Sequence, residues 1–310
     1  MRHPNLFILG AQRAGTTWLS DQLMRHPDIF FSTPKEPLLM GRRAAVTLDD
    51  YQQYLASAFK PPLSRMDLFS KLQERKYMAE GSANYFQSPF ALDRIRVFVP
   101  GRPKFIICLR HPVAKGISFF IHNWRRGRYK PGTGFSETLT PLGQFSPLFS
   151  SLYGEPIKRW LEAYPREDFL FLKYDDFSRD PVRYLSQVSD FLQIAPFPAP
   201  SQNAIMQYLR QVSDFLRIAP FPAPSQKVIN RGLSLVWKDD FLTPLDPGPA
   251  DHPAIGFNEL KDMHETVLPD IKLTQDLTGL DLSEWLTLRR EDMVDGASRL
   301  AMEKMIGVKE

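Results

Sequence analysis

The amino-acid sequence predicts an α/β fold in which a central parallel sheet is flanked by helices. Two observations predict it. Short apolar runs alternate with segments of helical spacing along the chain. The 310 residues, of which 43% are hydrophobic and 24% charged, have the size and composition of a single globular domain. We expect this domain to span residues 1–286 and residues 287–310 to form an amphipathic helical tail.

Three strand-to-helix units follow one another. Proline suits the first turn of a helix, and Pro112 and Pro181 each stand at such a position. The expected pairs of strand and helix are residues 5–9 with 16–25, residues 105–109 with 112–124, and residues 168–177 with the segment that Asp180 opens. Strands joined by helices run parallel, so we expect active-site residues at their carboxyl ends.

Two irregular segments interrupt the later chain. Residues 127–147 are rich in Gly, Pro, Ser and Thr and form the longest expected loop, which we interpret as a substrate lid. Residues 243–253 contain four prolines and form a second irregular connection, after which residues 257–277 have helical spacing.

One segment is duplicated in tandem. Residues 184–202 recur as residues 208–226, and the copies differ only where Ser186 and Gln193 become Arg210 and Arg217. Two copies are too few for a repeat architecture. We interpret the duplication, at about residues 184–231, as an insertion in which one copy keeps the original packing site and the other is displaced to the surface. A domain-swapped dimer is the alternative.

The stretch "FILGAQRAGTTWL", residues 7–19, has the spacing of the phosphate-binding P-loop G-x-x-x-x-G-K-[ST] with one substitution. Gly10 and Gly15 are in place, but Thr16 stands where the lysine that contacts β- and γ-phosphates belongs. Backbone N–H groups at the start of the following helix still favour an anion, and Arg13 adds a cation within the loop. The sequence therefore predicts a P-loop-like sheet and a donor whose transferred group is attached to a single 5′-phosphate.

Composition limits the other partners. A net charge of +4 suits an anionic ligand but falls short of a dedicated nucleic-acid binder. The single cysteine, Cys108, lies in an apolar run and excludes an intrachain disulfide. No apolar run is long enough for a membrane span, and none has the form of a signal peptide. We expect a cytoplasmic protein with no nucleic-acid or membrane partner; its oligomeric state is not predicted.

Four blocks of the sequence together resemble a known family. They are "FILGAQRAGTTWLSDQLMRHPDIFFSTPKEPLLM" at residues 7–40, "EGSANYF" at 80–86, "IICLRHPVAKGISFF" at 106–120 and "LTGLDLSEWL" at 277–286. In this order they resemble the sulfotransferases that use 3′-phosphoadenosine 5′-phosphosulfate (PAPS), and more closely their heparan-sulfate-like and bacterial branch. The first block resembles that family's 5′-phosphosulfate loop, helix, "HP" turn and "KE" segment, and the second its E-K-[ST]-P-x-Y-F motif.

The resemblance implies in-line transfer of a sulfuryl group from PAPS, as co-substrate, to a hydroxyl or amine without a metal ion. Arg13 would stabilise the transferring group and the leaving phosphate by its charge alone, since an arginine does not donate its proton. Glu36, the glutamate of the "KE" segment, would act as the base. The residues implied in binding PAPS are Arg13, Ala14, Gly15, Thr16, Thr17 and Trp18 for the 5′-phosphosulfate, Arg110 with Ser118 for the 3′-phosphate, and Arg231 with Gly232 in the last cofactor loop.

Two positions depart from the resembled motifs. Gly81 stands where the second motif has lysine, and Leu38 stands where the heparan branch often has histidine two residues after the base. Both residues face the acceptor in the relatives, so the departures favour a small-molecule acceptor over a heparan-like polysaccharide. The basic run at residues 124–130 binds either an acidic acceptor or the cofactor's 3′-phosphate, or it is a solvated surface, and His122 is a reserve base candidate.

Two other functions stay open. A P-loop kinase or NTPase would use Asp175 to hold Mg²⁺, although Thr16 argues against it. A catalytically inactive PAPS-binding protein would result if the duplication has spoiled the site. At the level of single residues, Glu36 could instead pair with Lys35, and the two arginines of the site could be surface ion-pair partners.

Overall fold

The computed structural model describes residues 2–60, 75–140, 145–197, 235–244 and 253–293. The chain divides into two compact units. The sheet unit comprises Met1–Arg110, Gly154–Pro198 and Leu277–Leu280, and the second unit comprises His111–Tyr153, Ala199–Asp276 and Asp281–Glu310. The domain boundary expected at residue 286 stays a prediction.

The sheet unit is built on five parallel strands in the order β2-β3-β1-β4-β5. The strands are β1 (Leu6–Gly10), β2 (Ile29–Phe31), β3 (Tyr77–Glu80), β4 (Lys104–Leu109) and β5 (Phe169–Lys173). Every residue of β1 and β3 is buried, as is all of β4 after Lys104. Strands buried on both faces are apolar without alternation, which explains the short apolar runs in the sequence. The predicted parallel sheet is confirmed.

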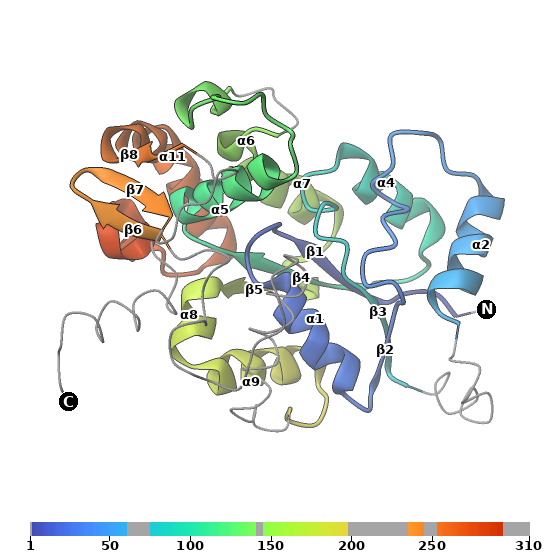
Figure 1. Cartoon of the computed structure of the whole chain (residues 1–310). Helices are drawn as coiled ribbons and strands as arrows, with labels where there is room; N and C mark the ends of the chain where they lie inside the picture. Colours follow the sequence, from blue (N-terminus) through green and yellow to red (C-terminus); the bar gives the residue numbers. More distant parts are fainter. Residues whose placement is uncertain (1, 61–74, 141–144, 198–234, 245–252, 294–310) are drawn as a thin grey trace, which may run out of the picture. The chain divides into compact units, whose positions relative to one another are not determined.

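Helices cover both faces of this sheet. Figure 1 shows α1 (Thr16–Arg25), α8 (Tyr174–Arg179) and α9 (Pro181–Leu192) on one face, and α4 (Pro89–Phe98) and α7 (Gly154–Ala163) on the other. Side chains of β4 reach both layers. The Tyr184 hydroxyl of α9 donates to Cys108 Sγ at 3.4 Å, whereas Phe105 packs on Trp160 of α7 with ring centroids 5.3 Å apart. Cys108 is therefore a core residue, as expected.

Most predicted elements of the sheet unit are present, with one shorter strand. The helix predicted over residues 16–25 is α1, but the strand predicted over residues 168–177 ends at Lys173, where α8 begins. Asp175 and Asp176 lie in the first turn of α8, where acidic side chains favour a helix N-terminus. Strands β2 and β3 and helix α2 (Leu48–Ala58) are additional elements; Thr47 and Asp50 form a capping box at the start of α2.

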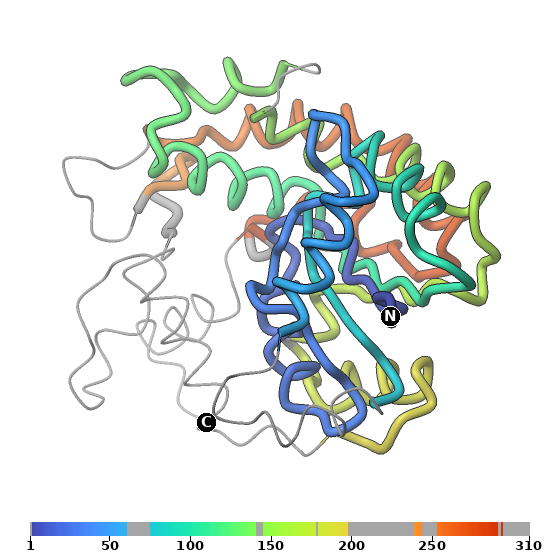
Figure 2. Tube along the Cα trace, turned by 90° about the vertical axis from the view of Figure 1, so that its right-hand side faces the viewer, coloured from blue at the N-terminus to red at the C-terminus, as the bar shows by residue number. Residues whose placement is uncertain are grey.

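The first copy of the duplicated segment has a defined packing site in the sheet unit. Asp180 caps α9, and the end of this helix is held through backbone carbonyls. Tyr77 donates its hydroxyl to Leu192 O at 3.0 Å, and His26 Nε2 lies 2.9 Å from Ala195 O. Figures 1 and 2 both show α9 beside the end of α1. The second copy, residues 208–226, lies outside the described residues, so the expected displacement of one copy stays a prediction.

The second unit combines helices with a small antiparallel sheet. Its elements are α5 (Pro112–Arg125), η2 (Ser136–Thr138), α6 (Pro147–Ser151), β6 (Leu235–Lys238), β7 (Phe241–Pro244), β8 (Ile255–Gly256), α11 (Phe257–Thr278), η4 (Ser283–Leu286) and η5 (Arg290–Met293). Both helices predicted here, residues 112–124 and 257–277, are present as α5 and α11. The loop interpreted as a lid is tied to α11 where Ser136 Oγ donates to Glu259 at 2.5 Å.

The described part of the tail contains the short 3₁₀ helix η5, and residues 294–310 lie outside the described chain. Within the described ranges, no helix combines the length and the apolar character that crossing a bilayer requires. In the same ranges, His, Cys, Asp and Glu side chains form no group of three or more that could hold a metal ion.

Candidate active site

The loop between β1 and α1 depends on its two glycines. Gly10 has a φ of 153°, and a Cβ there would lie 2.8 Å from Ala83 O and 2.9 Å from Phe86 Cβ. Gly15 is left-handed with a φ of 85°, and a Cβ there would lie 3.0 Å from the ring of Tyr174. Side chains at either position would strain or displace the loop. The glycine spacing seen in the sequence therefore reflects a tight strand-to-helix connection.

The N-terminus of α1 opens onto this loop. Gly15 caps the helix without a side-chain hydrogen bond, and the first turn contains no acidic residue. The N–H groups of this turn, from Thr16, Thr17 and Trp18, have no carbonyl partner within the helix. Thr16 and Trp18 are buried, whereas Thr17 is exposed. Such a helix N-terminus favours an anion.

The structure brings Arg13 and Arg110 together at the carboxyl ends of β1 and β4. Arg13 has a φ of 66°, a backbone conformation that is uncommon for residues with a side chain. Its carbonyl accepts a hydrogen bond from Arg110 Nη1 at 3.3 Å. The Arg110 guanidinium lies 4.7 Å from the centroid of the Tyr174 ring, and Arg110 is buried. Both arginines thus lie where parallel sheets carry their active sites.

Lys35 and Glu36 lie beside the first turn of α1. Lys35 Nζ is 3.4 Å from Thr17 Oγ1 and 3.1 Å from Glu36 Oε1. The side chain of Glu36 is 41% exposed and that of Lys35 is 19% exposed. The alternative expected for Glu36, a pair with Lys35, is therefore present. Because the pair contacts the first turn of α1, the base candidate also lies next to the anion-binding loop.

A second carboxyl group, that of Glu80, is fully buried at the end of β3. The Tyr54 hydroxyl of α2 donates to its Oε2. Burial raises the pKa of Glu80 to about 7, the charge of Glu36 adds to this effect, and hydrogen bonding from the Tyr54, Ser82 and Tyr85 hydroxyls opposes it. This carboxyl group therefore changes its charge near neutral pH.

Both departures from the resembled motifs lie near the Lys35–Glu36 pair. Gly81 contacts this segment from the end of β3, and Leu38 belongs to the segment itself. Gly81 N donates to Lys35 O at 3.2 Å, and a Cβ at Gly81 would lie 2.9 Å from Ser20 Oγ and 3.5 Å from Lys35 Cε. Leu38 has a φ of 62° and is 39% exposed. An apolar surface residue therefore stands two positions after Glu36.

The remaining predicted residues lie in other parts of the chain. Ser118 and His122 lie on α5 of the second unit, and Ser118 is buried. Arg231 and Gly232 fall outside the described residues. Asp175, the magnesium candidate of the alternative function, lies in the first turn of α8. A joint role of Ser118 with Arg110 stays a prediction.

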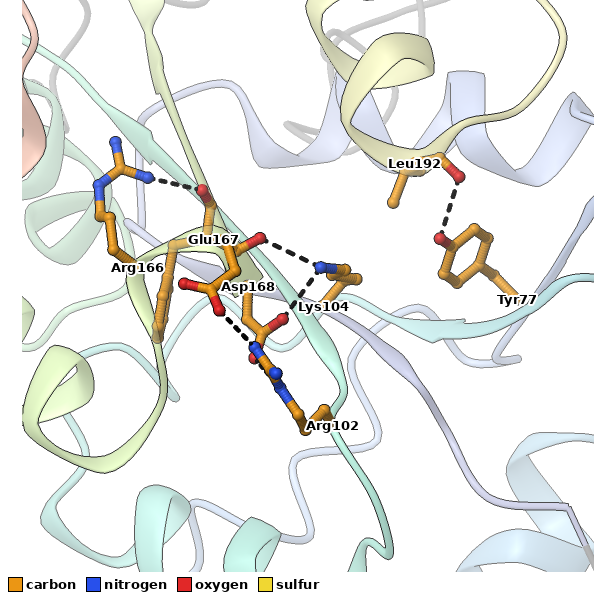
Figure 3. Close-up of polar contacts among 8 residues, drawn as sticks. Tyr77, Arg102, Lys104, Arg166, Glu167, Asp168 and Leu192 are labelled. Carbon is orange, nitrogen blue, oxygen red and sulfur yellow. Dashed lines mark hydrogen bonds and ion pairs between the residues drawn. The ribbon is translucent and has the colours of Figure 1, made fainter.

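The amino ends of β4 and β5 hold a different arrangement of charges (Figure 3). The buried carboxylate of Asp168 accepts from Arg102 Nε and from Lys104 Nζ, both at 2.9 Å. Burial alone would raise the pKa of Asp168, but the hydrogen bonds from Arg102 and Lys104 outweigh it and hold the pKa below its ordinary value. Arg102 also pairs with the exposed Glu167 at 2.8 Å. These charges neutralise one another within the protein.

Comparison with known proteins decides the family of this chain. The model of the sulfotransferase family matches residues 4–198, more than half of the chain. The chain belongs to the sulfotransferase family. The matched range includes the loop, the Lys35–Glu36 pair and Arg110, so these parts of the candidate site lie within the part of the chain that the family model matches. The prediction of the family is confirmed.

Two curated relatives are named for heparan sulfate modification. The bifunctional heparan sulfate N-deacetylase/N-sulfotransferase 4 of Mus musculus is 26% identical over 209 residues, which cover 62% of this chain and 22% of that protein. The heparan sulfate glucosamine 3-O-sulfotransferase 6 of Homo sapiens is 26% identical over 195 residues, which cover 62% of this chain and 52% of that protein. The chain thus spans about half the length of the second relative and about a fifth of the first.

A solved structure has the same fold. The crystal structure of a sulfotransferase from Alicyclobacillus acidocaldarius superposes with a TM-score of 0.59 at 22% identity, covering 93% of this chain and 100% of that chain. At this identity the likeness establishes the fold alone. It confirms the predicted P-loop-like α/β class.

Two features of the site were not found from the sequence. The contact between Lys35 and Thr17 joins residues in different segments, and no spacing signal connects them. The burial of Glu80 had a weak signal, because this glutamate directly follows the apolar residues Tyr77–Ala79 at a strand end. A carboxylate in that position lies at the edge of the sheet where active sites form.

Proposed function

We propose that this chain transfers a sulfuryl group from PAPS to a hydroxyl or amine of an acceptor molecule by in-line displacement. The observation that carries the proposal is a glycine-dependent loop and uncapped helix N-terminus in which Thr16 replaces the P-loop lysine. The family match favours this donor over ATP. The missing P-loop lysine agrees with it, because a phosphosulfate has no γ-phosphate for that lysine to hold. The proposal therefore includes no metal ion.

The chain's own residues divide the chemistry between two sides of the reacting sulfur. N–H groups of residues 14–18 and the charge of Arg13 stabilise the negative charge that builds on the 5′-phosphate. Glu36 takes the proton of the acceptor. A bond forms between the acceptor oxygen or nitrogen and sulfur as the bond from sulfur to the 5′-phosphate oxygen breaks. The electron pair of the broken bond stays on the phosphate, and the proton goes to the Glu36 carboxylate.

The remaining roles rest on the resemblance alone. We assign the 3′-phosphate to Arg110 and Ser118 and the last cofactor loop to Arg231 and Gly232. The buried position of Arg110 beside the phosphate loop supports its part in this assignment. The cytoplasm is the proposed compartment, on the ground that Cys108 is the one cysteine of the sequence.

For the acceptor we propose a small molecule rather than heparan sulfate. The support is local: Leu38 presents an apolar surface beside Glu36, and Gly81 has no side chain where the resembled motif has a cation. A polyanionic chain would need cations there. The curated relatives, by their names, act on heparan sulfate, so this polysaccharide is the acceptor to test against.

Two measurements test the proposal. In thermal shift, 3′-phosphoadenosine 5′-phosphate at about 100 times its Kd stabilises the folded protein by about 2.7 kcal/mol, whereas ATP with Mg²⁺ does not. Stabilisation by ATP with Mg²⁺ alone would point to the kinase alternative. Transfer of radiolabelled sulfate from PAPS is then measured into heparan sulfate and into a mixture of small alcohols and amines. Nucleotide binding without any transfer would identify an inactive binding protein.

A further inference from the structure

We propose that Lys35 is a further donor-binding residue, whose ammonium group contacts the 5′-phosphosulfate and replaces the P-loop lysine that is absent at Thr16. The inference rests on the proposed function, because it names an additional residue of the same site. It assigns a role in donor binding to the lysine of the "KE" segment, in addition to the role of its glutamate as the base.

The absence of a side chain at Gly81 makes room for Lys35. A Cβ at Gly81 would lie only 3.5 Å from Lys35 Cε, so the aliphatic part of Lys35 occupies the space that a residue-81 side chain would enter. The same Cβ would lie 2.9 Å from Ser20 Oγ on α1 and 3.1 Å from Phe31 Cζ on β2. Lys35 therefore runs between β2, the end of β3 and α1.

The backbone of Lys35 is held in place. Its carbonyl oxygen accepts from Gly81 N at 3.2 Å and from Ser32 Oγ at 3.2 Å. The side chain is 19% exposed. A fixed backbone and a largely covered side chain reduce the rotamer freedom that a lysine would lose on binding an anion.

The ammonium group ends at the anion-binding turn. Lys35 Nζ lies 3.4 Å from Thr17 Oγ1, and Thr17 contributes one of the N–H groups at the start of α1. An anion bound at that turn is therefore within the range of a charge-assisted hydrogen bond from Lys35.

The pair with Glu36 links donor binding to proton transfer. Lys35 Nζ lies 3.1 Å from Glu36 Oε1, so the charges of the two side chains neutralise each other. A phosphosulfate carries more negative charge than one carboxylate and competes for the ammonium. When Lys35 turns to the donor, Glu36 loses its partner and is free to accept the acceptor's proton. Donor binding thus precedes the activation of the base.

The experiment compares two nucleotides and three variants by calorimetry. The nucleotides are 3′-phosphoadenosine 5′-phosphate and adenosine 3′-monophosphate, which lacks the 5′ group. The variants are Lys35→Met, Lys35→Arg, and the control Lys158→Met on the exposed surface of α7 in the same unit. We expect Lys35→Met to weaken binding of the bisphosphate about 10- to 100-fold. Lys35→Arg and Lys158→Met should stay within about threefold of the wild type.

The monophosphate separates the possible outcomes. If Lys35 acts on the 5′ group, Lys35→Met leaves the affinity for adenosine 3′-monophosphate unchanged. An equal loss for both nucleotides indicates general damage to the site and overturns the role of Lys35. Wild-type affinity of Lys35→Met for the bisphosphate also overturns it and leaves the proposed function intact. If the wild type binds neither nucleotide, the proposed function itself is wrong.

Discussion

The two ends of the five-stranded sheet contain similar charged residues in opposite arrangements. At the amino ends of β4 and β5, the Asp168 carboxylate is enclosed between Arg102 and Lys104 (Figure 3). At the carboxyl ends, Lys35 and Glu36 lie beside a helix N-terminus that has no side-chain cap. The first end balances its own charges, whereas the second directs positive potential at an anion. We therefore expect substitutions at the amino ends to change stability and those at the carboxyl ends to change catalysis.

The largest effect is expected at Glu36. Replacing it by glutamine removes the proposed base while preserving size, so kcat should fall about 10²- to 10⁴-fold with little change in the KM for PAPS. Initial rates of sulfate transfer measure this effect. The matched change Glu167→Gln at the opposite end should leave the rate unchanged. If Glu36→Gln keeps more than about a tenth of kcat, the base lies elsewhere, and His122 is the next residue to test.

A smaller catalytic loss is expected at Arg13. Removing one charge that stabilises the transition state costs about 10²- to 10³-fold in kcat, so Arg13→Ala should lose that much. Arg13→Lys should recover most of the rate. Residue 13 has a φ of 66°, which costs similar free energy in alanine and in lysine. The difference in kcat between the two variants therefore reports the effect of the charge. A wild-type rate in Arg13→Ala would remove Arg13 from the mechanism.

Glu80 lies at the carboxyl ends of the strands but is buried, so we expect its substitution to change stability. Its pKa is raised by burial to about 7 in the folded protein, against about 4.5 when unfolded. Between these values the unfolded chain has lost the proton that the folded chain keeps, so the free energy of unfolding falls as pH rises, by up to about 3 kcal/mol. Glu80→Gln should abolish this fall.

Urea unfolding of the wild type and Glu80→Gln at pH 5, 6, 7 and 8 measures the difference. The two stabilities should converge at low pH, and the variant should gain on the wild type toward pH 8. Parallel curves across this range would mean that Glu80 does not titrate there.

At the opposite end, Asp168→Asn should lower the free energy of unfolding by about 1–2 kcal/mol, because Arg102 and Lys104 lose their common partner and both remain partly exposed. The pKa of Asp168 is lowered in the folded state, so its contribution is present above the ordinary value of 3.8 and is lost as pH falls below it. Unfolding curves at pH 7 and pH 3 test this. Sulfate transfer should be unaffected, and a large loss of rate would contradict the division between the two ends.

The same contrast explains how far the sequence could be interpreted. The buried strand β1 is apolar along its whole length and β4 is apolar after Lys104, and Gly10 and Gly15 mark the loop between β1 and α1, so the sheet and its anion-binding edge followed from local pattern. The contact of Lys35 with Thr17 and the burial of Glu80 could not follow, because they depend on how β2 and β3 pack beside α1. The Arg102–Asp168–Lys104 cluster likewise joins residues that are distant in the chain.

The smallest effect is expected from deleting residues 184–207, which removes the first copy of the duplicated segment. The end of the described copy is held at the amino ends of the sheet, where Tyr77 begins β3 and contacts the Leu192 carbonyl, whereas its first residue, Tyr184, packs on Trp18 of α1. The second copy supplies the same residues except at positions 186 and 193, and both of these are exposed in α9 and its end. It can therefore rebuild the helix with its carbonyl contacts.

We expect this deletion to change the free energy of unfolding by less than about 1 kcal/mol. Affinity for 3′-phosphoadenosine 5′-phosphate should also be kept, because Tyr208 of the second copy can take the place of Tyr184, whose ring packs on Trp18 of the phosphate loop. Soluble expression, urea unfolding and calorimetry check these expectations. A deletion variant that folds but no longer binds the nucleotide would mean that the second copy does not restore the contact with Trp18 and that the first copy supports the phosphate loop.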